Sequence, residues 1–138
     1  MNWKSRCLSA LDAEKMFEDS KHKTRFKELL DCYSDSPFFT KGLCKCMYLS
    51  AWDDSHFLIM LETLTSLSLN METNTKEMRD DGDSLAEAQK DGEYYVYQLS
   101  NAFLDNSPFS LDESADIAPE FRYIIERGLR AAEIIDNL

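Results

Sequence analysis

Residues 42–71, GLCKCMYLSAWDDSHFLIMLETLTSLSLNM, contain the pattern that decides the fold. Apolar side chains recur every three or four residues on both sides of the pair Asp53–Asp54, a spacing typical of α-helices. Asp53 or Asp54 is a good helix N-cap, because its carboxylate accepts backbone N–H groups and faces the positive end of the helix dipole. The stretch therefore predicts a helix over about 40–52, a corner, and a new helix that begins at the aspartates.

The helix after the corner is apolar on more than one side. It has a main apolar stripe, and Leu58, Ile59 and Leu69 add apolar groups off that stripe. Helices of this kind are usually buried on several sides, which predicts a central position for this one. The main stripe consists of Phe57, Met60, Leu61, Leu64, Leu67 and Met71.

The same reasoning predicts helices on both sides of this stretch. Two helices precede it, and the second ends near Ser34, because a residue that precedes proline is driven out of the α region. Residues 84–105 predict another helix, and Pro119 is suited to the first position of a last one. We therefore expect an all-α protein: one compact, orthogonal bundle of about five to seven helices, with residues 1–138 in a single domain.

The last predicted helix has small residues in its apolar stripe, namely Gly128, Ala131 and Ala132. Glycine lowers helix propensity, so a close approach by another helix is the expected compensation. That neighbour is either internal or in a second subunit, and the second alternative predicts a homodimer through this helix.

Composition limits the compartment and the partners. The N-terminal residues lack the apolar core of a signal peptide, and no stretch has the ~18 apolar residues of a membrane-spanning helix. We therefore expect a cytoplasmic protein without a membrane partner, whose four cysteines are reduced. The net charge is -11, and residues 70–120 hold thirteen acidic and three basic groups. Such a chain repels nucleic acid over most of its surface. We expect the acidic groups to form a solvated surface, and the alternative is that they suit a protein partner with a basic surface.

A short basic stretch, KHKTRFK at 21–27, is the local exception. It would suit phosphate or an acidic protein if its charges were free. Because Phe26, Leu29, Leu30 and Tyr33 give the segment an inward face, we expect a solvated helix start whose charges pair with acidic groups of the chain.

The opening stretch also holds residues that resemble a site. Cys44 and Cys46 point about 200° apart on a helix, so they cannot easily grip one ion, and we expect neither a metal nor a cofactor there. His56 lies three residues after Asp53. One interpretation is a general base oriented by a carboxylate. The favoured one is structural: Asp53 caps the helix, and His56 lies in its first turn, exposed or under Trp52.

Two E-x-x-D pairs, Glu28–Asp31 and Glu77–Asp80, give the strongest enzyme hypothesis. This spacing places two oxygen ligands on one helix face, where a second such pair could share Mg²⁺. The hypothesis of an Mg²⁺-dependent all-α hydrolase requires the four carboxylates to meet in one cleft. The favoured interpretation is that both pairs belong to solvated helix faces.

Three functions remain open at this point. The first choice is a non-enzymatic interaction or regulatory module, of the kind represented by an immunity or inhibitor protein that masks a basic enzyme surface. The Mg²⁺-dependent hydrolase is the second. The third is a small-molecule sensor with an aromatic pocket, formed by Trp52, Phe57, Tyr94, Tyr95 and Tyr97.

Overall fold

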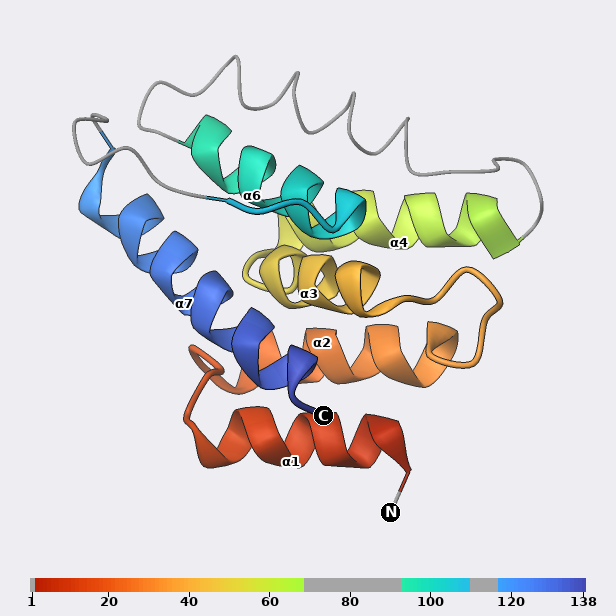
Figure 1. Cartoon of the computed structure of the whole chain (residues 1–138). Coiled ribbons are helices and arrows are strands. Elements are labelled where there is room, and N and C mark those ends of the chain that lie inside the picture. The colour runs from red at the N-terminus through yellow and green to blue at the C-terminus, as the bar shows by residue number, and fades with distance from the viewer. Residues whose placement is uncertain (1, 69–92, 110–116) are drawn as a thin grey trace.

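The structure is a computed structural model that describes residues 2–68, 93–109 and 117–138. These residues form six α-helices and no strand, so the predicted all-α class is confirmed (Figure 1). The helices are α1 (Trp3–Ala13), α2 (Ser20–Tyr33), α3 (Lys41–Ser50), α4 (Asp54–Ser68), α6 (Glu93–Asp105) and α7 (Pro119–Asp136).

The helices begin where capping side chains satisfy their first N–H groups. Asn2 accepts a hydrogen bond from the Ser5 N–H at 2.8 Å, and Thr40 accepts one from the Leu43 N–H at 3.1 Å. Asp53 accepts from the His56 N–H at 2.9 Å, which confirms it as the cap of α4. The predicted end of α2 near Ser34 and the predicted start of α7 at Pro119 are also confirmed. The beginning of the helix expected over 84–105 lies outside the described residues, and α6 is its described part.

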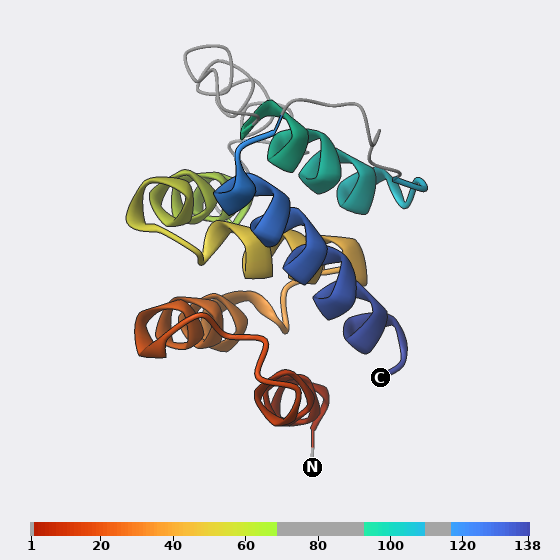
Figure 2. The same ribbon diagram turned by 90° about the vertical axis from the view of Figure 1, so that its left-hand side faces the viewer.

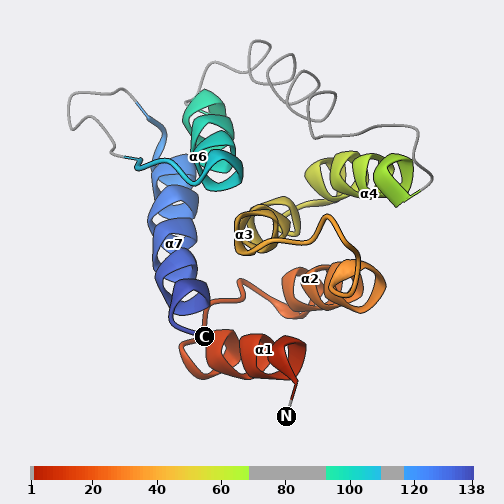
Figure 3. The ribbon, with the colours of Figure 1, turned by 45° about the vertical axis from the view of Figure 1, so that its right-hand side comes forward.

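The helices are arranged in a stack that α7 crosses. In Figure 2, α1, α2 and α4 are seen almost end-on, whereas α7 crosses the same view lengthwise. α6 and α7 contact each other, and both contact α3. Figure 3 shows α3 in the middle, with α2, α4, α6 and α7 around it. Side chains from all six helices meet in one hydrophobic core.

The centre of the bundle is α3, which corrects the expectation that the following helix would be central. Leu58 on α4 is 62% exposed, and among the described helices the backbone of α4 lies close only to α2 and α3, although the His56 ring also meets the Tyr97 ring of α6 at 5.4 Å. On α3, by contrast, every residue from Leu43 to Leu49 is buried, so Cys44 and Cys46 are both covered although they point to different sides. The additional apolar residues of α4 thus do not place this helix at the centre of the described bundle. The position of a helix depends on the neighbours that pack around it and not on its own composition alone.

The small residues of α7 permit a close approach inside the chain. A Cβ atom built on Gly128 would lie 2.8 Å from Leu49 Cδ2 and 3.3 Å from Leu99 Cδ2, on α3 and α6. Ala131 and Ala132 are buried too. The internal alternative therefore explains this stripe. A homodimer stays a prediction without a test in the structure.

Candidate functional site

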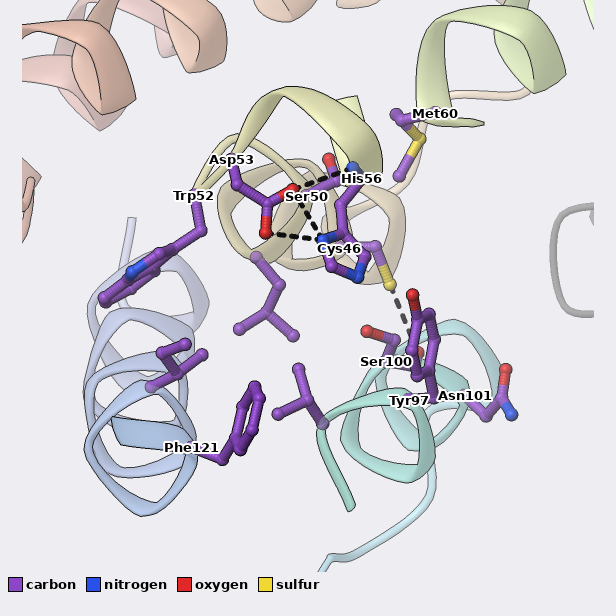
Figure 4. Close-up of a pocket in the computed structure, with 13 residues that line it drawn as sticks. Cys46, Ser50, Trp52, Asp53, His56, Met60, Tyr97, Ser100, Asn101 and Phe121 are labelled. Atoms are coloured by element: carbon purple, nitrogen blue, oxygen red, sulfur yellow. Dashed lines mark hydrogen bonds and ion pairs between the residues drawn. The ribbon is translucent and has the colours of Figure 1, made fainter. Parts of the chain in front are cut away.

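A pocket of about 80 Å³ lies between α3, α4, α6 and α7 (Figure 4). This is several times the roughly 10–15 Å³ that one water molecule requires. The thirteen lining residues are Cys46, Leu49, Ser50, Trp52, Asp53, His56, Met60, Val96, Tyr97, Ser100, Asn101, Phe121 and Ile124.

On α6 and on α7, helical spacing places the lining residues of each helix on one face. Tyr97, Ser100 and Asn101 are three and four residues apart, so they share one face of α6. Phe121 and Ile124 share a face of α7 in the same way. In Figure 4 the polar side chains from the α3–α4 corner lie on the opposite side of the space from Phe121. The pocket thus has an apolar side and a polar side.

Asp53 and His56 form the charged part of the polar side. The Nδ1 atom of His56 lies 2.6 Å from Oδ1 and 2.7 Å from Oδ2 of Asp53, so the imidazole N–H donates to the carboxylate. Burial alone would raise the pKa of Asp53, but the hydrogen bonds from the His56 side chain and backbone outweigh it and lower that pKa. The carboxylate is therefore ionised at neutral pH. The geometry fits both interpretations of this pair, because the Asp53 carboxylate caps the helix and also orients the imidazole of His56 as it would orient a general base.

The corner that carries Asp53 is held by Arg25 of α2. Its guanidinium donates to the carbonyl oxygens of Ala51 and Trp52, at 3.2 and 3.3 Å. It also pairs with Asp54 at 2.7 Å. These bonds hold the loop between α3 and α4, from which Trp52 and Asp53 line the pocket.

Cys46 joins two walls of the pocket. Its thiol donates to the carbonyl oxygen of Ser100 at 3.1 Å, and its side chain is almost completely buried. The other cysteines are placed elsewhere: Cys7 and Cys44 are buried together in the core, and Cys32 is exposed. Burial, followed by a hydrogen bond with Cys7, raises the pKa of Cys44. Among the described residues, no three His, Cys, Asp or Glu side chains are grouped so that they could hold a metal ion.

The predicted carboxylate pairs lie away from this pocket or outside the described residues. Glu28 and Asp31 are on the exposed face of α2. Asp31 is paired with Lys4 and Lys27, each at 2.7 Å, and its pKa is lowered by the hydrogen bonds from Lys27 and then Lys4. Glu77 and Asp80 lie outside the described residues. The Mg²⁺ hypothesis therefore stays a prediction, as does the basic-partner surface over 70–120, most of which is also undescribed.

The aromatic pocket expected from the sequence is present in part. Trp52 and Tyr97 line the pocket. Phe57 and Tyr95 are half-buried against the core instead, and the side chain of Tyr94 lies outside the described part. Sequence reasoning did not identify Ser50, Ser100 or Asn101, although the polar i, i+3, i+4 spacing of Tyr97, Ser100 and Asn101 on an otherwise apolar helix was a usable signal.

One residue of the basic stretch differs from the expectation of a solvated helix start. His22 is completely buried, and its ring centroid lies 4.8 Å from those of Tyr48 and Trp52. Its Nδ1 accepts the Glu18 N–H at 3.1 Å, so Nε2 carries the proton and donates to the Tyr48 carbonyl oxygen at 2.9 Å. Burial is the main cause that lowers its pKa. The neighbouring cations behave as expected and pair with acidic groups of the same chain: Lys23 with Asp12, Arg25 with Asp54, and Lys27 with Asp31.

Comparisons with protein-family models, curated proteins and solved structures find no match to this chain. Within the part of the chain that the structure describes, no helix combines the length and apolar character that crossing a membrane requires.

Proposed function

We propose that this protein binds a small molecule with an apolar body and a polar end, and that it acts as a ligand-binding regulatory module. The observation that carries the proposal is the pocket itself. Four helices contribute to it, one side is apolar, and Asp53 with His56 forms a fixed polar edge. Ligand sites are typically concave and mainly apolar, with a few placed polar groups that set the orientation.

This proposal favours the sensor among the three functions derived from the sequence. The interaction module rests on the charge of a region that is largely undescribed. The hydrolase requires four carboxylates, and two of them, Glu77 and Asp80, lie outside the described residues. A cytoplasmic location belongs to the proposal too, because four free cysteines fit a reducing compartment. Labelling of the Cys32 thiol in freshly lysed cells tests this location.

The test is a screen of small neutral, cationic and anionic compounds by two-dimensional NMR. Binding in the pocket is expected to shift the backbone amide signals of Cys46, Ser50 and Ser100. The variant Ser100→Leu fills the pocket from α6 and is expected to abolish these shifts. The matched control is Gln98→Leu, which adds the same side chain to the exposed face of the same helix.

Retained binding in Gln98→Leu together with loss in Ser100→Leu supports the proposal. Binding that persists unchanged in a folded Ser100→Leu protein overturns it, and so does a screen in which no compound shifts the three amides. If Ser100→Leu does not fold, Asn101→Leu occupies the same wall one residue further along and replaces it.

A further inference from the structure

We propose that the ligand of this pocket is a cation, namely a small molecule with an ammonium group on a short apolar body; this inference rests on the proposed function. It follows from three properties of the lining: an ionised carboxylate with acceptor capacity, aromatic rings beside it, and the charges of the surrounding groups.

The carboxylate of Asp53 retains room for a donor. Oδ1 accepts the backbone N–H and the imidazole N–H of His56, whereas Oδ2 receives only the imidazole N–H among the described residues. A carboxylate oxygen has two acceptor sites, so Oδ2 has capacity for an ammonium N–H. The side chain is 51% exposed although the residue lines the pocket, so a ligand can reach it.

Aromatic rings lie around the same space. Three aromatic residues line the pocket: Trp52 from the α3–α4 corner, Tyr97 from α6 and Phe121 from α7. The face of an aromatic ring attracts a cation, most strongly for Trp, and this attraction increases where water is excluded. Leu49, Val96 and Ile124 supply the apolar surface on which the hydrocarbon part of the ligand would pack.

The surrounding charges disfavour an anionic ligand. Among the described residues that line the pocket there is no Lys or Arg, and Asp53 is the single carboxylate. Arg25 holds the adjoining corner, where its guanidinium is paired with Asp54 and donates to two carbonyl oxygens. The net charge of -11 adds a long-range attraction for cations. A carboxylate ligand would find neither a cation nor a favourable field.

The experiment compares three probes with the same hydrocarbon chain: butylamine, 1-butanol and butyrate. Each is titrated into the full chain at low salt and one fixed pH, and the Ser50 and Ser100 amide signals are followed by NMR. Butylamine is expected to bind about two- to fivefold more tightly than 1-butanol, because its ammonium group would form a partly solvated ion pair with Asp53. Butyrate is expected to bind more weakly than both. Added salt is expected to reduce only the advantage of the amine.

Asp53→Asn tests the carboxylate directly, because Asn is an equally good N-cap and leaves the start of α4 intact. The variant is expected to lower butylamine affinity to that of 1-butanol without changing 1-butanol binding. Glu62→Gln removes the same charge from the exposed surface of α4 and is expected to leave all three affinities unchanged.

The outcomes separate the two proposals. If 1-butanol or butyrate binds as tightly as butylamine, or if Asp53→Asn retains the preference for the amine, the cation inference is wrong while the pocket remains a binding site. If none of the three probes shifts the two amides at any accessible concentration, the cation inference falls, and the proposed function falls with it once the wider screen is also negative.

Discussion

Acidification is expected to destabilise this protein through His22. In the folded state the ring is enclosed by Phe17, Tyr48 and Trp52, and its proton is on Nε2. A second proton would have to bind Nδ1, which accepts the Glu18 N–H, so that two donors would face each other at 3.1 Å. The charge would also lie in a position with no solvent exposure. Both effects oppose protonation.

The direction of the pH dependence follows from the lowered pKa. Burial lowers the pKa of His22 below its ordinary value of 6.5, although the Tyr48 carbonyl, Asp19 and Glu18 partly oppose this and Arg25 adds to it. The unfolded chain therefore binds a proton that the folded protein does not. Stability is fully present above about pH 6.5 and is lost as the pH falls, by up to about 1.4 kcal/mol for each pH unit until the folded pKa is reached.

The assay is urea denaturation of the wild type and of His22→Gln between about pH 5 and 8. The Gln variant does not titrate, and at pH 8 it is expected to be less stable by about 1–3 kcal/mol, because the Glu18 N–H loses its acceptor. The difference in the free energy of unfolding between the two proteins should shrink below pH 6.5. The acidic side chains titrate in both proteins and cancel in that difference. A difference that stays constant over this range would refute the reasoning.

Three further predictions concern packing and charge. Gly42→Ala is expected to destabilise the protein by about 2–3 kcal/mol, since the added Cβ would overlap the Phe103 carbonyl oxygen of α6, and an unchanged thermal midpoint would contradict this. Leu64→Ala is expected to lower the free energy of unfolding by about 2–5 kcal/mol because Leu64 is completely buried, whereas Leu58→Ala should lower it by less than about 0.5 kcal/mol because Leu58 is 62% exposed. Equal effects of the two variants in urea denaturation would mean that α4 is oriented differently. Asp136→Asn is expected to destabilise by about 1–2 kcal/mol, because the nearly buried Lys45 loses its partner at 2.8 Å. Lys45→Met should be close to neutral, and thermal melts in which Lys45→Met is the more destabilising change would contradict this reasoning.

The helix ends could be predicted because they are set by local interactions. Asp53 caps α4 and Pro119 begins α7 through contacts within a few residues, which the sequence displays directly. The centre of the bundle could not be predicted in this way. α4 is the more apolar of the two helices, yet α3 is the enclosed one, because α6 and α7, which follow much later in the chain, pack on it.

The candidate site was predictable only in fragments, for the same reason. The pocket joins Cys46, Asp53, Tyr97 and Phe121, which come from four separate segments, and no local spacing connects them. His22 shows the opposite failure. Its neighbours Lys21 and Lys23 made it look like part of a charged surface, but at helical spacing it shares the inward face of Phe26 and Leu29. The period of the helix was a better guide to its environment than the charge of adjacent residues.

The enclosed position of α3 has a consequence for the dynamics of the protein. α2, α4, α6 and α7 all contact it, so its backbone amides become accessible to solvent only when several of these neighbours separate at once. Slow hydrogen exchange in α3 should then report the unfolding of the whole bundle. Leu49, Ser50 and the adjoining corner form one wall of the pocket, so the pocket should disappear in the same cooperative event. A molecule bound there would add its binding free energy to the stability of the entire fold, not of one local segment.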